Sequence, residues 1–282
     1  MSILRAVGLG VSFKGLHALE DVSVEVHEDE IVGLIGPNGA GKSTCFNCLT
    51  GLLDPDTGTV LLGEEDVTAL PPHERARLGM GRTFQTVQLF GGMTVEENVL
   101  VGSHNRVAHG IVADGLRLPS SRSGERIARA EVREILELLD LWEERDRPAR
   151  TLPLGEQRKV ELARSLAQHP RVLLLDEPLA GVSRQAKQGT VETLRRIRRE
   201  FGVSLLVIEH DMRLIMAITD FVYVLNAGRL LAKGTPEEVR ANREVIVAYL
   251  GEGGEDRSWP SAGSRGGSRA AAGGADPGPR RR

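Results

Sequence analysis

Residues 36–44 read GPNGAGKST and match GxxxxGK[ST], the pattern of a phosphate-binding loop. Glycines let the backbone N–H groups of such a loop wrap around phosphate oxygens, and the helix that follows directs its positive N-terminal end at them. In this pattern Lys42 reaches the β- and γ-phosphates of a nucleotide, and Ser43 binds Mg²⁺. A purely structural turn is the alternative. The sequence predicts a nucleotide site whose loop residues are Gly36, Pro37, Asn38, Gly39, Ala40, Gly41, Lys42, Ser43 and Thr44.

Two adjacent carboxylates, Asp176 and Glu177, end the apolar run in RVLLLDEP. Burying a charge is costly unless it has a partner. In a parallel sheet, this end of the strand lies beside the phosphate-binding loop. There Asp176 can orient Mg²⁺, and Glu177 can accept a proton from the attacking water. The alternative is an acidic helix cap after the strand.

Three further residues are candidates, and each has an ordinary alternative. Gln85 ends the strand-like segment GRTFQ, and its amide could contact both Mg²⁺ and water. His210 ends the apolar run in LLVIEHD; its imidazole could hydrogen-bond the γ-phosphate or the water, although a lone histidine is more often a satisfied polar residue. Phe13 precedes the loop at a distance that suits stacking on adenine, with a core aromatic as the equal alternative.

The two cysteines, Cys45 and Cys48, form a CxxC pattern that could indicate redox chemistry or half a zinc site. No second cysteine pair or histidine cluster completes a metal site in the sequence, and both residues fall where a helix should pack. We therefore expect them to be buried apolar filler. Two cysteines without a secretory signal also fit a reducing compartment.

The elements that must position these residues alternate between strands and helices. Strands are expected in LRAVGLGVSF, VSVEV and IVGLIG, and the last of these leads into the loop and a helix from Lys42 toward Gly51. The runs VLLLDE and SLLVIEH are unbroken and apolar, as in parallel strands buried on both faces, and each follows a helix-like segment. The sequence predicts an α/β fold.

The last strands and helix before residue 250 carry local turn and cap signals. The segment FVYVLNAGRLLAKG is expected to be a hairpin that turns near Asn226 to Gly228. In the helix that follows, Thr235 can cap, Pro236 fits the first helical position and Glu238 completes a capping box.

The domain organisation follows from composition. Residues of about 88 to 160 are polar and repeat apolar residues at helical spacing, so we expect a helical lobe inserted into an α/β body that spans residues 1–250. Residues 251–282 are rich in Gly, Ser, Ala and Arg and cannot offset their ordering entropy, so we expect a disordered tail. Its arginines could touch anionic lipid, but a solvated end is the simpler expectation.

Length and charge exclude several classes of protein. The chain has 282 residues, 40% of them hydrophobic, which is enough to bury a substantial core. No window holds the roughly 18 consecutive apolar residues of a membrane span, and no secretory signal is evident, so we expect a cytosolic chain. The net charge of −3 gives no electrostatic support for a nucleic-acid partner.

The order of these features resembles that of the ATP-binding cassette (ABC) ATPases. The order is Phe13, GPNGAGKST, Gln85, LPLGEQ, VLLLDEP and IEHD, and the resemblance covers residues 3–250. Within this superfamily, three segments are similar to the ATP-binding subunits of branched-chain amino acid importers: VGLIGPNGAGKSTCFNCLTGLLDPDTGTV, RLGMGRTFQTVQLFGGMTVEENVLVGSH and GTPEEVRANREVIVAYLGE.

The resemblance implies a P-loop fold with a mainly parallel core sheet, an N-terminal antiparallel β subdomain and an inserted helical lobe. It implies an ATPase that uses ATP and Mg²⁺ to drive uptake, held peripherally at the cytoplasmic face of the plasma (inner) membrane. The implied catalytic residues are Glu177, His210, Gln85 and Lys42, and the implied metal-site residues are Ser43, Gln85 and Asp176.

The implied partners are integral membrane permease subunits, a second ABC ATPase subunit and, through the permease, an external solute-binding protein. The ATPase pair is expected to be a heterodimer, with a homodimer as the alternative. Leu89 and Phe90 are candidate contacts with a membrane subunit, or they simply pack within the lobe. Branched-chain amino acids are the implied cargo, with urea, amides or another small polar solute as alternatives.

Residues 152–156, LPLGE, stand where the family has its signature loop, LSGGQ, which caps the γ-phosphate bound by the opposite subunit. Gly155 matches, and the helix behind it should direct its N-terminus at that phosphate. Pro153 replaces the serine, which removes a hydroxyl and a backbone N–H. Leu154 and Glu156 replace a glycine and the glutamine, and Ser183 departs from the acidic residue that is common in the following loop. These departures put the site formed in trans in doubt, but not Lys42, Ser43, Asp176 or Glu177.

Two other functions are alternatives. A soluble ABC-type ATPase could act on ribosomes or DNA, but translation factors of this superfamily usually carry two cassettes and DNA-repair relatives carry long coiled coils, and this sequence has neither. A nucleotide-binding regulator that does not hydrolyse is disfavoured by Glu177, because loss of that base is the simplest route to such a role.

Overall fold

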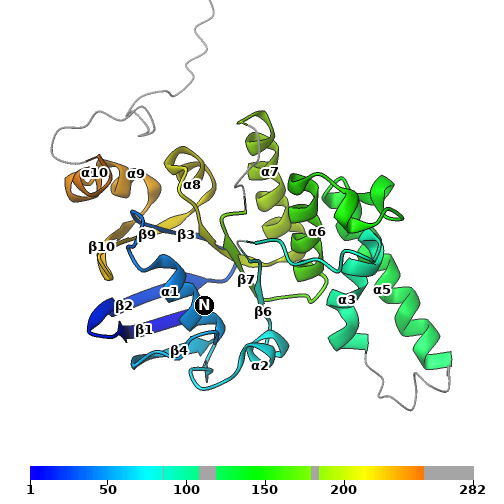
Figure 1. Cartoon of the computed structure of the whole chain (residues 1–282), viewed down its shortest axis with the longest axis horizontal. Helices are drawn as coiled ribbons and strands as arrows, with labels where there is room; N and C mark the ends of the chain where they lie inside the picture. Colours follow the sequence, from blue (N-terminus) through cyan, green and yellow to red (C-terminus); the bar gives the residue numbers. More distant parts are fainter. Residues whose placement is uncertain (85, 108–118, 179–183, 251–282) are drawn as a thin grey trace, which may run out of the picture.

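The computed structural model describes residues 1–84, 86–107, 119–178 and 184–250, which form two sheets and a group of helices (Figure 1). The predicted tail at 251–282 lies outside this part of the chain, as do Gln85 and Ser183. Among the described helices, none is long and apolar enough to cross a membrane.

The central sheet has six strands in the order β10-β9-β3-β8-β7-β6. Five of them are parallel, and only β10 pairs antiparallel, with its neighbour β9. Every residue of β3, β7 and β8 is buried, which is why their sequences are unbroken apolar runs. The bounds are β3 Ile31–Ile35, β6 Met80–Arg82, β7 Val172–Asp176, β8 Ser204–Ile208, β9 Phe221–Asn226 and β10 Arg229–Gly234.

The two faces of this sheet pack against different layers. Val32 and Leu34 of β3 join a core with Phe46 of the first helix and with the antiparallel sheet. Their neighbours Ile31 and Ile35 join a second core that contains the helices of the lobe. The alternation follows from the two-residue period of a strand, and it fixes the sheet between its two layers.

The antiparallel sheet has the order β2-β1-β4-β5. Its strands are β1 Ser2–Phe13, β2 Leu16–His27, β4 Thr57–Leu62 and β5 Glu65–Asp66. In β2, Val22, Val24 and Val26 are buried and alternate with more exposed residues, as expected of a strand with one face on the core. The predicted fold, a P-loop α/β body with an N-terminal antiparallel subdomain, is confirmed.

The helices between residues 95 and 166 gather at one side of the central sheet (Figure 1). Helix α3 contacts both α5 and α6, so these three form the group that the helical spacing predicted. The helices are α1 Lys42–Thr50, α2 Pro72–Arg77, α3 Val95–Val107, α5 Pro119–Leu138, α6 Leu154–Leu166, α7 Arg184–Phe201, α8 Met212–Ile218, α9 Pro236–Ala241 and α10 Arg243–Leu250, with single 3-10 turns η1 Trp142–Glu144 and η2 Ala149–Thr151.

Both local signals near the end of the described chain are confirmed. Strands β9 and β10 form the predicted hairpin, and Ala227 and Gly228 at its turn have positive φ angles of 46° and 79°. The Thr235 side chain accepts a hydrogen bond from the Glu238 backbone N–H, and the Glu238 side chain accepts one from the Thr235 backbone N–H, so the capping box is complete.

Candidate nucleotide site

The loop at residues 36–44 leaves the carboxyl end of β3 and opens α1. A Cβ atom at Gly36 would collide with the backbone carbonyl of Leu225. Gly41, the N-cap of α1, has φ 101°, and a Cβ there would lie 2.6 Å from the Ala18 carbonyl oxygen. Only glycine fits these two positions, because a side chain would be both strained and in contact with backbone. The loop is therefore held close to two other segments of the chain.

Lys42 lies inside this loop. Its Nζ donates to the carbonyl oxygens of Gly36 and Pro37, at 2.7 and 3.0 Å. Burial lowers the pKa of Lys42, while the nearby carboxylates of Glu177 and Asp176 act in the opposite direction. An ammonium group in the loop, close to two carboxylates, is suited to contact the oxygens of a bound phosphate.

A cavity of about 550 Å³ is lined by the loop and by the end of β7. Residues 38–44 line one part of it, and Asp176 and Glu177 line another. The topology explains this proximity, because β8 alone separates β3 from β7 and the three strands run parallel, so their carboxyl ends share one edge. The structure thus brings the predicted loop and the two predicted carboxylates into one site.

Asp176 is the last residue of β7 and is buried, with 8% of its surface exposed. Burial raises the pKa of its carboxyl, and the Arg82 guanidinium opposes this shift. Ser43 also lines the cavity. A carboxylate and a hydroxyl are the kind of oxygen ligands that Mg²⁺ prefers, so this donor set fits that ion.

Glu177 turns out of the strand rather than continuing it. Its φ is 48°, a left-handed value that is rare for a residue with a side chain. Its backbone is fixed on both sides: its N–H donates to the Ile208 carbonyl at 3.0 Å, and its own carbonyl accepts from Arg158 Nη1 at 2.7 Å. The side chain is 26% exposed, so water can reach a carboxylate held at a defined position.

His210 lies just beyond β8 and next to Glu177. Its Nδ1 is 3.9 Å from Glu177 Oε1 and 3.7 Å from Glu209 Oε2, and its side chain is 63% exposed. The imidazole is exposed and close to two carboxylates, so its role at the γ-phosphate or the water stays a prediction beside that of a satisfied polar residue. Glu209, which sequence reasoning missed, is buried; the signal was an acidic residue directly after an apolar run.

Phe13 ends β1, opposite Leu16, and is 48% exposed. The alternative that it is a core aromatic is therefore wrong. Leu16 and the two residues after it line the cavity, which places the end of this strand pair beside the loop. Gln85 lies outside the described residues, so its role stays a prediction.

The segment LPLGE forms the start of α6. Pro153 is the N-cap, with φ −56° and ψ 149°, and Leu154 begins the helix. A Cβ at Gly155 would meet no atom within 4 Å, and Leu154 is 54% exposed. The predicted helix is confirmed, and its first turn borders a cavity that Asp176 and Glu177 also line. The N-terminus carries the partial positive charge of α6.

Cys45 and Cys48 are both buried, and they do not form a disulfide. Burial raises the pKa of Cys45 to about 12 and that of Cys48 to about 11, so both thiols are protonated at neutral pH. No cluster of three or more potential metal ligands (His, Cys, Asp or Glu) occurs among the described residues. The prediction that both cysteines are buried is confirmed.

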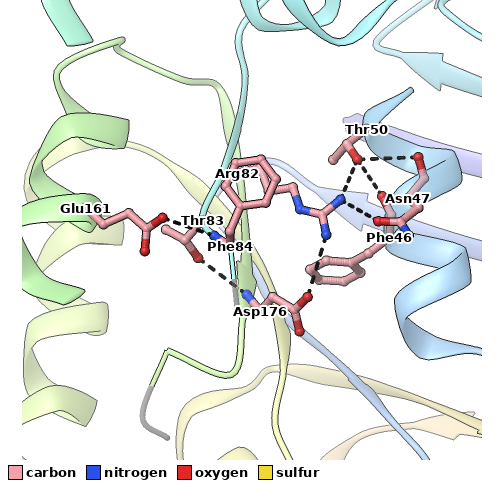
Figure 2. A network of polar contacts seen from close by, with 8 residues as sticks. All are labelled: Phe46, Asn47, Thr50, Arg82, Thr83, Phe84, Glu161 and Asp176. Atoms are coloured by element: carbon pink, nitrogen blue, oxygen red, sulfur yellow. Dashed lines mark hydrogen bonds and ion pairs between the residues drawn. The ribbon is translucent and has the colours of Figure 1, made fainter. Parts of the chain in front are cut away.

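Sequence reasoning missed two further charged residues near the site, Arg82 and Glu161 (Figure 2). Arg82 ends β6 and pairs with Asp176. Glu161 of α6 is buried and accepts a hydrogen bond from the Phe84 backbone N–H. The signal for Arg82 was a charged residue at the end of a short strand, three positions before Gln85.

Comparison with known proteins agrees with this geometry. A family model described as "ABC transporter" matches residues 19–180, and one described as "Branched-chain amino acid ATP-binding cassette transporter" matches residues 229–255. The chain is similar to LivG, a high-affinity branched-chain amino acid transport ATP-binding protein of Salmonella typhimurium, with 45% identity over 89% of this chain and 98% of LivG. BraF of Pseudomonas aeruginosa, which has the same description, is 44% identical over the same shares.

The fold is similar to that of a solved ATP-binding cassette of an ABC transporter in its ADP conformation. The TM-score is 0.77 and the identity 32%, covering 89% of this chain and 100% of the other. The likeness therefore extends over the two sheets and the helical group.

Proposed function

Since this chain belongs to the ABC transporter family of ATP-binding proteins, we propose that it is the ATP-hydrolysing subunit of an importer for branched-chain amino acids. The observation that supports ATP hydrolysis is that one cavity is lined by the phosphate-binding loop, including Lys42, and by Asp176 and Glu177. The cargo part is supported by the printed functions of LivG and BraF and by the match at residues 229–255.

In the proposed reaction a water molecule attacks the γ-phosphorus of ATP, the bond to the β-phosphate oxygen breaks, and ADP and phosphate leave. The loop N–H groups and Lys42 would hold the phosphates. Gln85 would contact both Mg²⁺ and the water, and His210 would hydrogen-bond the γ-phosphate or the water. Glu177, whose backbone is fixed at both ends, accepts the proton of the water. Ser43 and Asp176 would hold Mg²⁺, which neutralises charge on the phosphates when bound. Phe13 would stack on adenine.

The proposed partners are membrane permease subunits, a second ABC ATPase subunit and an external solute-binding protein that acts through the permease. The chain would then be peripheral at the cytoplasmic face of the inner membrane. Residues 1–250 would form the ATPase domain with the helical lobe at about 88–160 inserted, and residues 251–282 a disordered tail.

A groove of about 910 Å³ beside α3 and α6 suits contact with a permease. Leu89 and Phe90 both line it. Leu89 packs partly against the core of the lobe, whereas Phe90 is 49% exposed and its ring lies 5.8 Å from the Arg164 guanidinium. We infer that Phe90 provides apolar contact area for the permease and that Leu89 supports it.

The departures in LPLGE fit an asymmetric ATPase pair, in which one signature face is weakened. Pro153 as the N-cap of α6 offers neither a hydroxyl nor an N–H to a phosphate of the opposite subunit. If Pro153→Ser changed neither ATP-driven pairing nor turnover, this inference would be wrong.

The test of the proposed function is uptake of labelled leucine, isoleucine, valine and urea by the source cells, with a chromosomal Glu177→Gln change. The variant should lose hydrolysis while its fold and assembly stay intact. A joint fall in uptake of the three amino acids supports the proposal. A fall in urea uptake alone would mean that the ATPase role stands and the cargo is urea. No fall would mean either that another transporter compensates or that the ATPase has no membrane partner, and co-purification with membranes would decide between these two.

A further inference from the structure

The Arg82 side chain lies between α1, the helix of the phosphate-binding loop, and the end of β7 (Figure 2). Its Nη1 donates to Asn47 Oδ1 at 2.9 Å and to Thr50 Oγ1 at 2.8 Å. Both acceptors belong to α1. The guanidinium is thus fastened to α1 through one of its nitrogens.

The other terminal nitrogen faces the metal-site carboxylate. Arg82 Nη2 lies 3.6 Å from Asp176 Oδ2, an ion pair whose two side chains are 12% and 9% exposed. The next residue in the chain, Thr83, accepts a hydrogen bond from the Asp176 backbone N–H at 3.4 Å. Residues 82 and 83 therefore hold Asp176 by both its side chain and its backbone.

Aromatic rings enclose the guanidinium. Its central carbon lies 5.1 Å from the centre of the Phe84 ring and 6.0 Å from that of Phe46. Rings at such distances attract a cation and limit its contact with water. Arg82 therefore has little freedom to leave Asp176.

Two cations lie near Asp176, and they differ in what else they can do. Lys42 lies in the phosphate-binding loop, so a bound phosphate would engage it. Arg82 is absent from the described residues that line the loop cavity, and its anchors on α1 do not depend on a ligand. Burying a carboxylate is costly unless it stays paired with a cation. Arg82 is the cation that its anchors on α1 keep beside Asp176.

We propose that Arg82 is a positioning residue, which holds the Asp176 carboxylate against α1 so that it can engage Mg²⁺ bound with a nucleotide. The inference rests on the proposed function, because it needs Asp176 at the metal site. It differs from two other roles for Arg82. A purely structural tie between β6 and α1 would affect nucleotide binding with or without metal, and a guanidinium acting only as a nearby positive charge would repel Mg²⁺.

The test is titration calorimetry of the full chain with ADP, in excess Mg²⁺ and in EDTA, for the unchanged chain, Arg82→Gln and Arg82→Lys. The quantity compared is the gain in ADP affinity that Mg²⁺ provides. Changes to residues that orient metal ligands typically lower metal affinity about 10- to 100-fold, so we expect a loss of that order in the gain for Arg82→Gln, with the affinity in EDTA unchanged. Arg82→Lys keeps the charge with fewer donors and should restore part of the gain.

Arg196→Gln is the matched control, because it removes a guanidinium from an exposed ion pair with Glu200 on α7 and lies outside the described lining of the loop cavity. Its Mg²⁺-dependent gain should stay close to that of the unchanged chain. If Arg82→Gln lost the same ADP affinity in Mg²⁺ as in EDTA, Arg82 would be only a structural tie and the inference would be overturned. A Mg²⁺-dependent gain in ADP affinity that is unchanged or larger in Arg82→Gln would also overturn it. If Arg82→Gln does not fold, an Arg82→Lys gain equal to that of the unchanged chain overturns it. An unchanged chain without any Mg²⁺-dependent gain would contradict the proposed metal site itself.

Discussion

Replacement of Arg75 by alanine should strongly destabilise the fold, because this buried guanidinium binds four backbone carbonyls. Only 1% of Arg75 is exposed. Its nitrogens donate at 2.7 to 2.8 Å to the carbonyl oxygens of Cys48, Leu49, Leu70 and Thr68. Cys48 and Leu49 belong to the last turn of α1, where carbonyls lack helical partners and the helix dipole favours a cation.

The magnitude follows from opposing contributions. Hydrogen bonds to a charged group contribute about 1.5–3 kcal/mol each, so four of them amount to roughly 6–12 kcal/mol. Burial of the guanidinium opposes this by several kcal/mol, in line with a pKa of Arg75 that burial lowers. Arg75→Ala would also remove this donor from all four carbonyls, of which Cys48 keeps the bond from the Gly51 backbone N–H. We expect a loss of about 3–5 kcal/mol in the free energy of unfolding.

Urea unfolding followed by circular dichroism measures this loss. The control is Arg229→Ala, which removes an exposed ion pair with Glu20 (2.6 Å) and should cost about 0–1 kcal/mol. Arg75→Lys, whose single ammonium cannot reach four carbonyls spread over two segments, should lie between the two. A loss for Arg75→Ala as small as that for Arg229→Ala would refute the reasoning.

Two further predictions concern the loop and the lobe. Gly41→Ala should be less stable than Gly39→Ala by about 1–3 kcal/mol, because both residues have positive φ but only at Gly41 would the Cβ meet backbone, 2.6 Å from the Ala18 carbonyl oxygen; equal thermal unfolding of the two variants would contradict this. Burial raises the pKa of Glu161 above its ordinary value of 4.5, so the folded chain holds this proton more tightly than the unfolded chain. The contribution of Glu161 to stability should therefore be full below pH 4.5 and fall as the pH rises through the folded pKa. Glu161→Gln should make the free energy of unfolding depend less on pH in this range. An unchanged slope would show that the pKa of Glu161 is not raised in the folded chain.

The sequence predicted most of the fold, because strong local patterns coincide with the elements. The unbroken apolar runs became β3, β7 and β8, and the signals of Thr235 and Glu238 became a complete capping box. The loop and the carboxylates at the end of β7 were predicted to meet because parallel strands share one carboxyl edge.

The parts that the sequence did not predict depend on long-range contacts. Arg82 and Asp176 are far apart in the chain and meet only because β6 pairs with β7. Glu161 occupies a helix position that periodicity alone cannot assign to the core or to a loop contact. The exposure of Phe13 and His210 likewise depends on what packs around them, so the sequence could not decide between a role in the site and an ordinary structural role for either residue.

The most direct test of the central claim is phosphate release from ATP by the purified full chain, compared between the unchanged chain and Glu177→Gln. Glu65→Gln, an exposed position on β5 outside the described cavity lining, is the control. If Glu177 is the base, its variant should still bind ATP, but phosphate release should fall by about 10²- to 10⁴-fold, while the control keeps its rate. Undiminished release by Glu177→Gln would contradict the assignment of hydrolysis to this site.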